Sequence, residues 1–314
     1  MFCARTARAM RAHLGAAGAA VTIGGFDGIH IGHQALITRV REAAGRLGVP
    51  AVVMSFEPLP KEYFASGAAP ARLTRFRERF AVLDELGVDA FFCPRFDAQL
   101  AAIPVQRFID DLLIGALGLR HLVIGDDFRF GHRAAGGVDD LRGAGAQHGF
   151  ELEQVGSVFL DEVRVSSTRV REALAQGDMD WVRRALGRPY RLTGKVIKGQ
   201  QLGRTLGYPT ANLRLHRRTS PVSGIFAVRV AGIDDGWRDG VASIGTRPTV
   251  DGVGVLLEVH VFDFAGDLYG RRLEVELVEK LRDEERFENL DALVEQMNAD
   301  ATAARAALAA TMTP

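Results

Sequence analysis

The chain has 314 residues, of which 39 are basic, 39 are acidic and 47% are hydrophobic, so its formal net charge is zero. Balanced charge argues against a protein held mainly to nucleic acid or to an anionic membrane, and no run of about 18 apolar residues is present to span a bilayer. The length favours two domains. The two cysteines, Cys3 and Cys93, lie outside any disulfide or zinc spacing, so we expect a reducing, cytoplasmic location.

The first twenty residues contain Arg5, Arg8 and Arg11 and no acidic residue. An organellar transit peptide has a similar composition. We instead expect an alanine-rich leader that frays, because it runs directly into the first apolar strand.

A strand, a glycine-rich turn and a helix start coincide between residues 21 and 34. An apolar run ending at Ile23 indicates a buried strand, and apolar residues at helical spacing from Leu36 to Leu47 indicate a helix packed on it. The N–H groups of a helix N-terminus attract anions, and glycines let a phosphate approach the backbone closely. The turn therefore predicts a phosphate site, with the candidate residues Gly24, Phe26, Asp27, His30, Gly32 and His33. A plain turn is the alternative, and zinc would need further ligands that do not lie nearby in the sequence.

Short apolar strands alternate with amphipathic helices through the rest of the first half. We expect strands at 51–56, 90–92 and 121–124, a helix that follows Thr74 and ends at Gly87, and a helix from Pro104. This alternation predicts an α/β fold with a parallel sheet covered on both faces. Ligands of such sheets bind beyond the carboxyl ends of the strands.

Two loops that follow strands contain polar side chains that are candidates for ligand binding. Residues 125–131 combine two acids, including Asp127, with two aromatics and an arginine, which suits a cleft with a stacking surface and a charged rim. A surface turn with its aromatics in the core is the alternative. Farther on, Ser167, Thr168 and Arg171 open a helix, where hydroxyl groups cap the first turn. Capping explains one hydroxyl, so this group also suggests a second anion site.

The residues His30-Ile31-Gly32-His33 are similar to the phosphate-handling H-x-G-H motif of the nucleotidyltransferase superfamily, which includes class I aminoacyl-tRNA synthetases. The chain also has F-E-P at 56–58, G-D-D-F-R-F-G at 125–131 and S-S-T-x-x-R at 166–171. In this order the four motifs resemble the FMN adenylyltransferase module of bacterial bifunctional FAD synthetases. A tRNA synthetase would instead show a lysine-rich K-M-S-K-S-type loop, and none is visible.

The second half has a different periodicity. Asp178 is placed to cap a short helix that Gly187-Arg188-Pro189 breaks, so we expect the domain boundary at 187/188. Beyond it, apolar residues alternate along five or six short strands, which predicts a small antiparallel β-barrel. A final helix begins near Asn289 and runs into an alanine-rich tail that we expect to fray. We therefore expect residues 1–187 to form a Rossmann-like domain and residues 188–314 to form a barrel with a C-terminal helix.

Two places in the predicted barrel carry candidate chemistry. Thr210 and Asn212 put two neutral oxygens on one side of an extended segment, and magnesium favours such oxygens together with phosphates. Glu258 shares a strand face with Leu256 and His260, and we expect that face to point inward, where a carboxylate is costly unless it is paired or catalytic. As a general base, Glu258 could take a proton from a hydroxyl that attacks a γ-phosphate. Alternatively, Glu258 faces solvent at the barrel rim, and Thr210 and Asn212 only stabilise a turn.

The second half resembles riboflavin kinase through several motifs. These are G-R-x-L-G-Y-P-T-A-N-L at 203–213, S-I-G-T-R-P-T at 243–249, E-V-H at 258–260, D-L-Y-G at 267–270 and L-R-D-E-x-x-F at 281–287. With the first half, the whole chain is similar to bifunctional riboflavin kinase/FMN adenylyltransferases. Gly25, Leu59, Phe226 and Ser243 depart from the family pattern, and Leu59 and Ser243 bear on substrate affinity.

The resemblance implies two reactions, each with ATP as co-substrate. In the barrel, Glu258 would deprotonate the ribityl hydroxyl of riboflavin, and Thr210 and Asn212 would hold Mg²⁺-ATP, giving FMN. In the α/β domain, FMN would attack the α-phosphorus of a second ATP to give FAD. There His30 and His33 would stabilise phosphate charge, and Ser167, Thr168 and Arg171 would bind the departing diphosphate. The resemblance also implies nucleotide and flavin contacts in the barrel from Gly199, Arg204, Gly207, Pro209, Arg282, Glu285 and Phe287.

Two rival interpretations stay open at this point. One is an enzyme with a single working half, and the other is a non-catalytic flavin-binding or regulatory protein. We expect riboflavin, FMN and ATP as partners, no nucleic acid or membrane partner, and a monomer or weak homo-oligomer.

Overall fold

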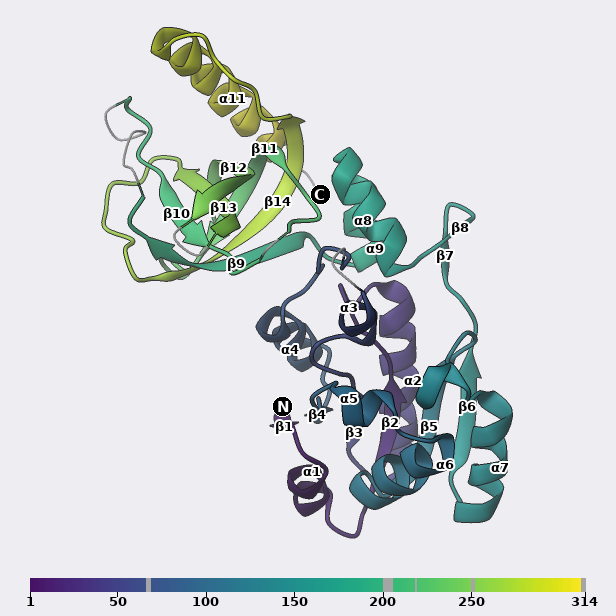
Figure 1. Cartoon of the computed structure of the whole chain (residues 1–314). Helices are drawn as coiled ribbons and strands as arrows, with labels where there is room; N and C mark the ends of the chain where they lie inside the picture. The colour runs from purple at the N-terminus through teal and green to yellow at the C-terminus, as the bar shows by residue number, and fades with distance from the viewer. Residues whose placement is uncertain (66–68, 200–205, 218, 250–251, 312–314) are drawn as a thin grey trace. The chain divides into compact units, whose positions relative to one another are not determined.

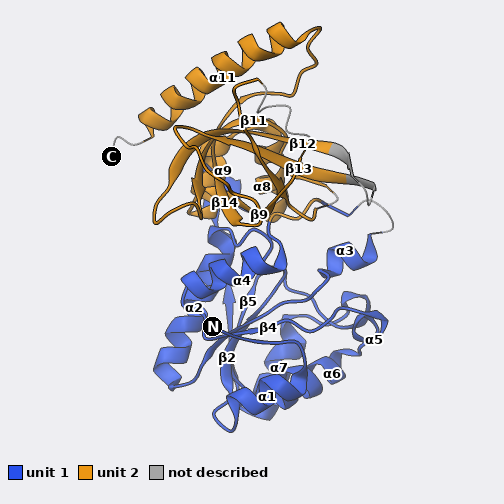
Figure 2. Cartoon of the chain, turned by 90° about the vertical axis from the view of Figure 1, so that its left-hand side faces the viewer, with its two compact units in different colours: residues 1–70, 74–166 blue, residues 71–73, 167–314 orange. Residues whose placement is uncertain are grey.

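The computed structural model describes residues 1–65, 69–199, 206–217, 219–249 and 252–311. Packing divides the chain into two compact units (Figure 2): unit 1 contains Met1–Pro70 and Thr74–Ser166, and unit 2 contains Ala71–Leu73 and Ser167–Pro314. Two helices that precede the barrel, α8 (Ser167–Gln176) and α9 (Met179–Leu186), therefore pack with unit 2. The boundary at 187/188 concerns the division between the two activities and stays a prediction.

Unit 1 is built on a six-stranded sheet with the order β1-β4-β3-β2-β5-β6, in which every neighbouring pair is parallel (Figure 1). In the centre, Val21 of β2 pairs with Val52 of β3 and with Leu122 of β5. The predicted parallel α/β fold is confirmed, and β2, β3 and β5 end at the same edge of the sheet. The strands are β1 (Phe2–Ala4), β2 (Ala19–Ile23), β3 (Ala51–Met54), β4 (Ala90–Phe92), β5 (Leu119–Gly125) and β6 (Glu151–Val155).

Helices cover both faces of this sheet. Val21 and Ile124 pack in a core with α1, η1 and α7 on one face, whereas Val53 and Val123 pack under α2 and α4 on the other. This two-sided burial explains why the central strands are continuous apolar runs. The helices are α1 (Ala7–Leu14), α2 (Ile31–Leu47), α3 (Pro60–Phe64), α4 (Phe76–Glu85), α5 (Ala98–Ala101), α6 (Val105–Arg107), the π-helix η1 (Phe108–Ala116), the short 3₁₀ turn η2 (His132–Ala134) and α7 (Val138–His148), with a small hairpin of β7 (Phe159–Leu160) and β8 (Val163–Arg164).

The N-terminal segment is ordered, so the expectation of a frayed leader is wrong. Phe2 of β1 pairs with Ala90 of β4, which adds the segment to the edge of the sheet. The Thr6 hydroxyl accepts a hydrogen bond from the N–H of Ala9 and caps α1. Met10 and Leu14, one helical turn apart, are buried in the core. Two well-spaced apolar residues are thus enough to dock a helix that its composition alone does not reveal.

Unit 2 contains a closed antiparallel barrel with the strand order β10-β13-β12-β11-β14-β9. Aliphatic residues such as Leu192, Leu213 and Leu257 are fully buried at alternate positions along its strands. The predicted barrel is confirmed. The strands are β9 (Tyr190–Ile197), β10 (Ala211–Arg214), β11 (Gly224–Ala231), β12 (Arg238–Thr249), β13 (Gly252–Val261) and β14 (Arg272–Arg282).

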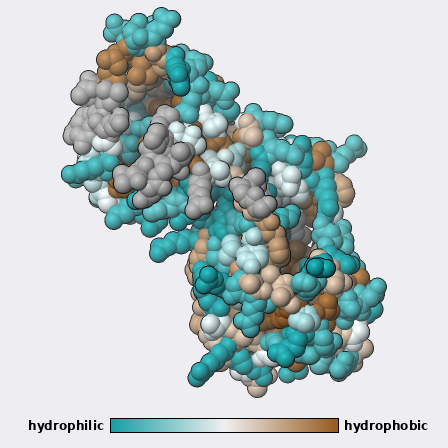
Figure 3. Space-filling view, in the orientation of Figure 1, coloured by the Kyte–Doolittle hydropathy of each residue, from teal (hydrophilic) through white to brown (hydrophobic). Residues whose placement is uncertain are grey.

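The C-terminal helix α11 (Leu290–Ala310) begins where predicted, because the Asn289 side chain accepts a hydrogen bond from the N–H of Ala292. Its alanine-rich end stays helical through Ala310, so the expectation of fraying there is wrong. Ala304 and Leu308 are fully buried against the barrel, and small side chains let the helix approach closely. On the face shown in Figure 3, hydrophobic residues gather over α11. No helix in the described ranges combines the length and apolar character needed to cross a bilayer.

Replacing Met10 by Ala should lower the free energy of unfolding by about 2–4 kcal/mol, because a fully buried side chain is removed and a cavity is left. Urea unfolding of the full chain, followed by circular dichroism, measures the change. The exposed neighbour on the same helix, Arg8→Ala, should change it by less than about 0.5 kcal/mol. Equal stability of both variants and the parent chain would show that α1 is not part of the core.

Candidate active sites

The turn after β2 is the first candidate site. The N–H of Gly24 donates to the carbonyl of Met54 at 3.1 Å, which prolongs the β2–β3 pairing by one residue. Phe26 and Ile29 then adopt positive φ angles of 48° and 45°, and both side chains are fully buried. Such φ values are uncommon for bulky residues and persist only where the surroundings enforce them. The turn is therefore held in place by its own buried apolar side chains.

His30 and His33 lie together where α2 begins. His30 is the N-cap residue, and its Nδ1 accepts a hydrogen bond from the N–H of His33 at 3.4 Å. The two rings stack, with centroids 3.8 Å apart and an interplanar angle of 18°. Because Nδ1 is the acceptor, a neutral His30 carries its proton on Nε2, which leaves that atom as a donor. An ideal Cβ at Gly32 would lie 3.1 Å from this Nδ1, so the glycine leaves room for the ring.

Asp27 is 4% exposed, and its carboxylate binds Thr74. Oδ1 accepts hydrogen bonds from the Thr74 N–H at 2.9 Å and from the Thr74 hydroxyl at 3.2 Å, while the N–H of Gly28 donates to that hydroxyl at 2.9 Å. These contacts hold the turn against the segment that precedes α4. Contact of Asp27 with a nucleotide stays a prediction.

Asp127 follows β5, which pairs in parallel with β2, so it lies at the same sheet edge as residues 24–33, which we call the histidine turn. Its side chain is exposed and accepts a hydrogen bond from Arg164 at 2.8 Å. Of the two aromatics in this loop, Phe130 is buried against Phe108, and Phe128 stacks on Phe130. The aromatics therefore pack toward the core, as the alternative interpretation predicts. The groups of this loop that remain available to a ligand are its charged side chains.

Ser167, Thr168 and Arg171 open α8, as expected. They belong to unit 2, whereas the histidine turn belongs to unit 1. The Nε of Arg171 donates to the carbonyl of Ala71 at 2.6 Å, so the guanidinium is tied to the short 71–73 segment of its own unit. A role for the three residues in diphosphate binding stays a prediction.

The second candidate site lies on the outer face of the barrel. Glu258 of β13 stands opposite Asn212 of β10 on one side and opposite Ser243 of β12 on the other. The residues of β13 that fill the interior are Leu257 and Val259, so the expectation that Glu258 points inward is wrong. Alternation along a strand puts Glu258 on the opposite, half-buried face. A carboxylate is tolerated there because water can reach it.

Asn212 is only 6% exposed although it shares this outer face. Gly199 explains its burial, because an ideal Cβ at that position would lie 2.5 Å from the Asn212 amide nitrogen. Nearby, the Nδ1 of His260 lies 2.9 Å from the carbonyl of Pro209, and the Tyr208 hydroxyl donates to Asn298 of α11. These contacts hold the segment that leads to Thr210, and the predicted contacts of Gly207 and Pro209 stay predictions. Arg204 lies outside the described residues.

Arg282 ends β14 and is fixed by α11. Its guanidinium pairs with Asp300 at 2.7 Å and lies 5.6 Å from the centre of the Phe287 ring. The hydrogen bond with Asp300 raises the pKa of Arg282 above its usual value, so the side chain stays charged. Glu285 is exposed beside it. Contact of Arg282, Glu285 and Phe287 with flavin stays a prediction.

Sequence reasoning missed the polar partners that come from distant segments. Thr74 marks only a helix start in the sequence, yet it binds Asp27, 47 residues away. Ser243 stands out only as a departure from the family pattern, yet its hydroxyl lies 3.4 Å from Glu284, next to Glu258 in register. No local spacing signals either contact.

Comparison with known proteins covers both units. Residues 14–169 match a family model described as FAD synthetase, and residues 186–308 match one described as riboflavin kinase. The chain is 50% identical over 290 residues to a bifunctional riboflavin kinase/FMN adenylyltransferase of Pseudomonas fluorescens, covering 92% of this chain and 93% of that protein. It belongs to the bifunctional riboflavin kinase/FMN adenylyltransferase family. The enzyme of the same description from Escherichia coli strain K12 is 47% identical over 288 residues, 92% of each chain.

Membership in the bifunctional riboflavin kinase/FMN adenylyltransferase family makes the chain an enzyme of FAD biosynthesis, with riboflavin, FMN and ATP as substrates. The two rival interpretations are therefore wrong. A solved structure named macrolide-efflux protein, from Streptococcus pneumoniae, is 32% identical with a TM-score of 0.83, covering 97% of this chain and 98% of that one. That likeness supports the fold over the whole chain. The activity in its name is a statement about that protein alone.

The geometry at Gly32 predicts a selective loss of adenylylation. Gly32→Ala should lower the rate of FAD formation from FMN about tenfold, because the new Cβ forces the His30 ring to shift by a few tenths of an ångström. Gly45→Ala in the same helix, where nothing lies within 4 Å of an added Cβ, should not. Assays of FMN-to-FAD conversion compare the two, and equal rates would contradict the tight packing at His30.

The corresponding change in the barrel is Gly199→Ala. It should lower riboflavin phosphorylation at least about tenfold and leave FAD formation from FMN unchanged, since the added Cβ collides with the Asn212 amide. Gly236→Ala, in an open surface turn of the same unit, is the control. Full kinase activity of Gly199→Ala would remove Asn212 from the site.

Proposed function

We propose that the two reactions of FAD synthesis occur at two separate sites, one at the histidine turn of unit 1 and one beside Glu258 on the barrel of unit 2. The observation that carries this proposal is the placement of Glu258 directly opposite Asn212, away from the barrel interior. A half-buried base beside an amide oxygen on the outer face of the barrel suits a hydroxyl group that must meet a bound triphosphate. The turn of unit 1 offers hydrogen-bond donors, which suit the phosphates of the other reaction.

Adenylyl transfer is proposed to use the start of α2. A phosphate oxygen of FMN attacks the α-phosphorus of ATP, the new P–O–P bond forms, and diphosphate leaves. The N–H groups of the helix start and the Nε2 proton of a neutral His30, with the His33 ring stacked on it, offset the charge that develops on the phosphates. Ser167, Thr168 and Arg171 are proposed to bind the leaving diphosphate. Positioning and charge neutralisation account for catalysis without a covalent enzyme intermediate.

Riboflavin phosphorylation is proposed to use Glu258 as general base. Its carboxylate takes the proton of the ribityl 5′-hydroxyl as that oxygen attacks the γ-phosphorus of ATP, and ADP leaves. Thr210 and Asn212 offer neutral oxygens beside it, a donor set that fits magnesium carried with ATP phosphates. When bound there, magnesium neutralises phosphate charge. Arg282 and Phe287 are proposed to lie near the flavin.

Other finer features belong to the same proposal. The functional boundary is placed at 187/188, and the enzyme is proposed to work in the cytoplasm as a monomer or weak homo-oligomer. The free thiols of Cys3 and Cys93 support a reducing compartment. Balanced charge supports the absence of a nucleic-acid partner.

Single substitutions should separate the activities. Glu258→Ala should abolish FMN formation and leave FMN-to-FAD conversion intact, whereas His30→Ala should lower FAD formation from FMN at least about 100-fold and leave the kinase intact. Product analysis with riboflavin or FMN as the starting substrate, each with Mg²⁺ and ATP, measures both steps.

Matched controls are the exposed residues Glu279 on β14 and His132 on η2. Glu279→Ala and His132→Ala should keep both activities within about twofold, as surface changes usually do. If Glu258→Ala and His30→Ala impaired both steps to the same degree, two separate sites would be the wrong model.

A further inference from the structure

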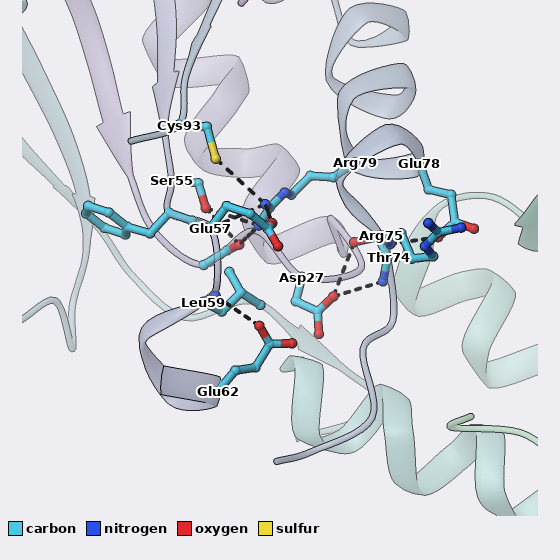
Figure 4. A network of polar contacts seen from close by, with 12 residues as sticks. Asp27, Ser55, Glu57, Leu59, Glu62, Thr74, Arg75, Glu78, Arg79 and Cys93 are labelled. Atoms are coloured by element: carbon cyan, nitrogen blue, oxygen red, sulfur yellow. Dashed lines mark hydrogen bonds and ion pairs between the residues drawn. The ribbon is translucent and has the colours of Figure 1, made fainter. Parts of the chain in front are cut away.

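Arg79 of α4 is a buried charge that the proposed reactions do not yet use. Its side chain is 1% exposed, and a guanidinium is costly to bury unless it is paired and hydrogen-bonded. Glu57, just beyond β3, supplies the charge at 3.0 Å. The neighbouring Cys93 thiol stays neutral, because burial raises its pKa to about 11. Glu57 is therefore the charged partner among these contacts (Figure 4).

Two further hydrogen bonds of Arg79 connect it to the histidine turn. One terminal nitrogen donates to the carbonyl of Gly25 at 3.0 Å and to the hydroxyl of Ser55 at 3.2 Å. The Ser55 hydroxyl itself donates to the same Gly25 carbonyl at 3.1 Å. Two donors thus draw one carbonyl of the turn into the protein interior.

This carbonyl determines where the next backbone donor points. In a trans peptide, the C=O of Gly25 and the N–H of Phe26 point in opposite directions. With the carbonyl held inward by Arg79 and Ser55, the N–H of Phe26 points outward. Phe26 carries the positive φ described above, so its peptide needs an external constraint to keep this orientation.

The same stretch of chain fixes the turn at a second point. Thr74, five residues before Arg79, binds Asp27 and Gly28 at 2.9 Å each. Figure 4 shows the Arg79 cluster with Ser55, Glu57 and Cys93, and the Asp27–Thr74 pair beside it. The turn from 25 to 28 is therefore clamped by residues 74 and 79, which lie far from it in the sequence.

We propose that Arg79 is a positioning residue for adenylyl transfer. It holds the Gly25 peptide so that the N–H of Phe26 and the start of α2 face the phosphates of ATP. This inference rests on the proposed phosphate site at the histidine turn. Glu57 compensates the charge of the guanidinium and orients it, and Ser55 shares its acceptor.

The test measures kcat and KM of FMN adenylylation for Arg79→Met, with riboflavin phosphorylation by the same chain as internal reference. We expect kcat to fall about 30-fold or more, since a small misplacement of a catalytic group costs up to about 100-fold, while the kinase rate stays within about twofold. Arg79→Lys keeps the charge but not the fork of donors, so it should recover only part of the loss.

Two controls separate positioning from folding. Leu83→Ala removes a fully buried side chain from the same helix and should lower the melting temperature at least as much as Arg79→Met, yet keep kcat within about threefold below the transition. Arg77→Met, at an exposed position of α4, should change nothing. A kcat loss that follows melting temperature equally in Leu83→Ala and Arg79→Met, or full activity of Arg79→Met, would overturn the proposal. His30→Ala distinguishes the proposed site itself: if it kept FAD formation while Arg79→Met lost it, the phosphate site at the histidines would fail and not the role of Arg79.

Discussion

The chemistry of unit 1 depends on the parallel register of β2 between β3 and β5. Burial on both faces fixes these strands, and their parallel direction brings their carboxyl ends to one edge of the sheet. The chain must turn sharply there to enter α2, and the turn places backbone N–H groups and two stacked histidines at the helix start. The phosphate site proposed at the histidine turn follows from this placement.

The parts of the fold that are local in sequence were predictable. The apolar run before Gly24, the helical spacing after His33 and the alternation beyond Gly187 gave the parallel sheet and the barrel, because each pattern reports burial of its own segment. The position of the histidines at a helix N-terminus followed from the same reasoning. The resemblance to two families supplied the substrates, which periodicity alone does not give.

What could not be predicted depends mainly on contacts between distant segments. The face of β13 that fills the barrel was, by contrast, open to prediction: its odd-numbered residues are all Val or Leu, whereas the even-numbered ones include Glu258 and His260. The inward expectation for Glu258 gave too much weight to Leu256 on the same face. Thr74 and Arg79 meet the histidine turn across about fifty residues of sequence. The first helix was obscured by alanines and arginines, although Met10 and Leu14 dock it.

The segment around α8 shows that packing and family boundaries differ. Ser167 and Thr168 fall within the residues matched by the FAD synthetase model, which ends at 169, while packing groups them with unit 2. α9 lies between the two family matches except for its last residue, Leu186, and contacts β9 and β14 of the barrel. The helices α8 and α9 therefore pack within unit 2, although the first residues of α8 belong to the stretch that matches the FAD synthetase model.

The central claim is that one chain carries two catalytic sites that work independently. The most direct measurement mixes equal amounts of the Glu258→Ala and His30→Ala variants with riboflavin, Mg²⁺ and ATP and follows FAD. Neither variant alone should form FAD from riboflavin at an appreciable rate, but the mixture should, because FMN released by one chain is adenylylated by the other. If the mixture formed no FAD and neither variant retained its single step, the claim of two independent sites would be contradicted.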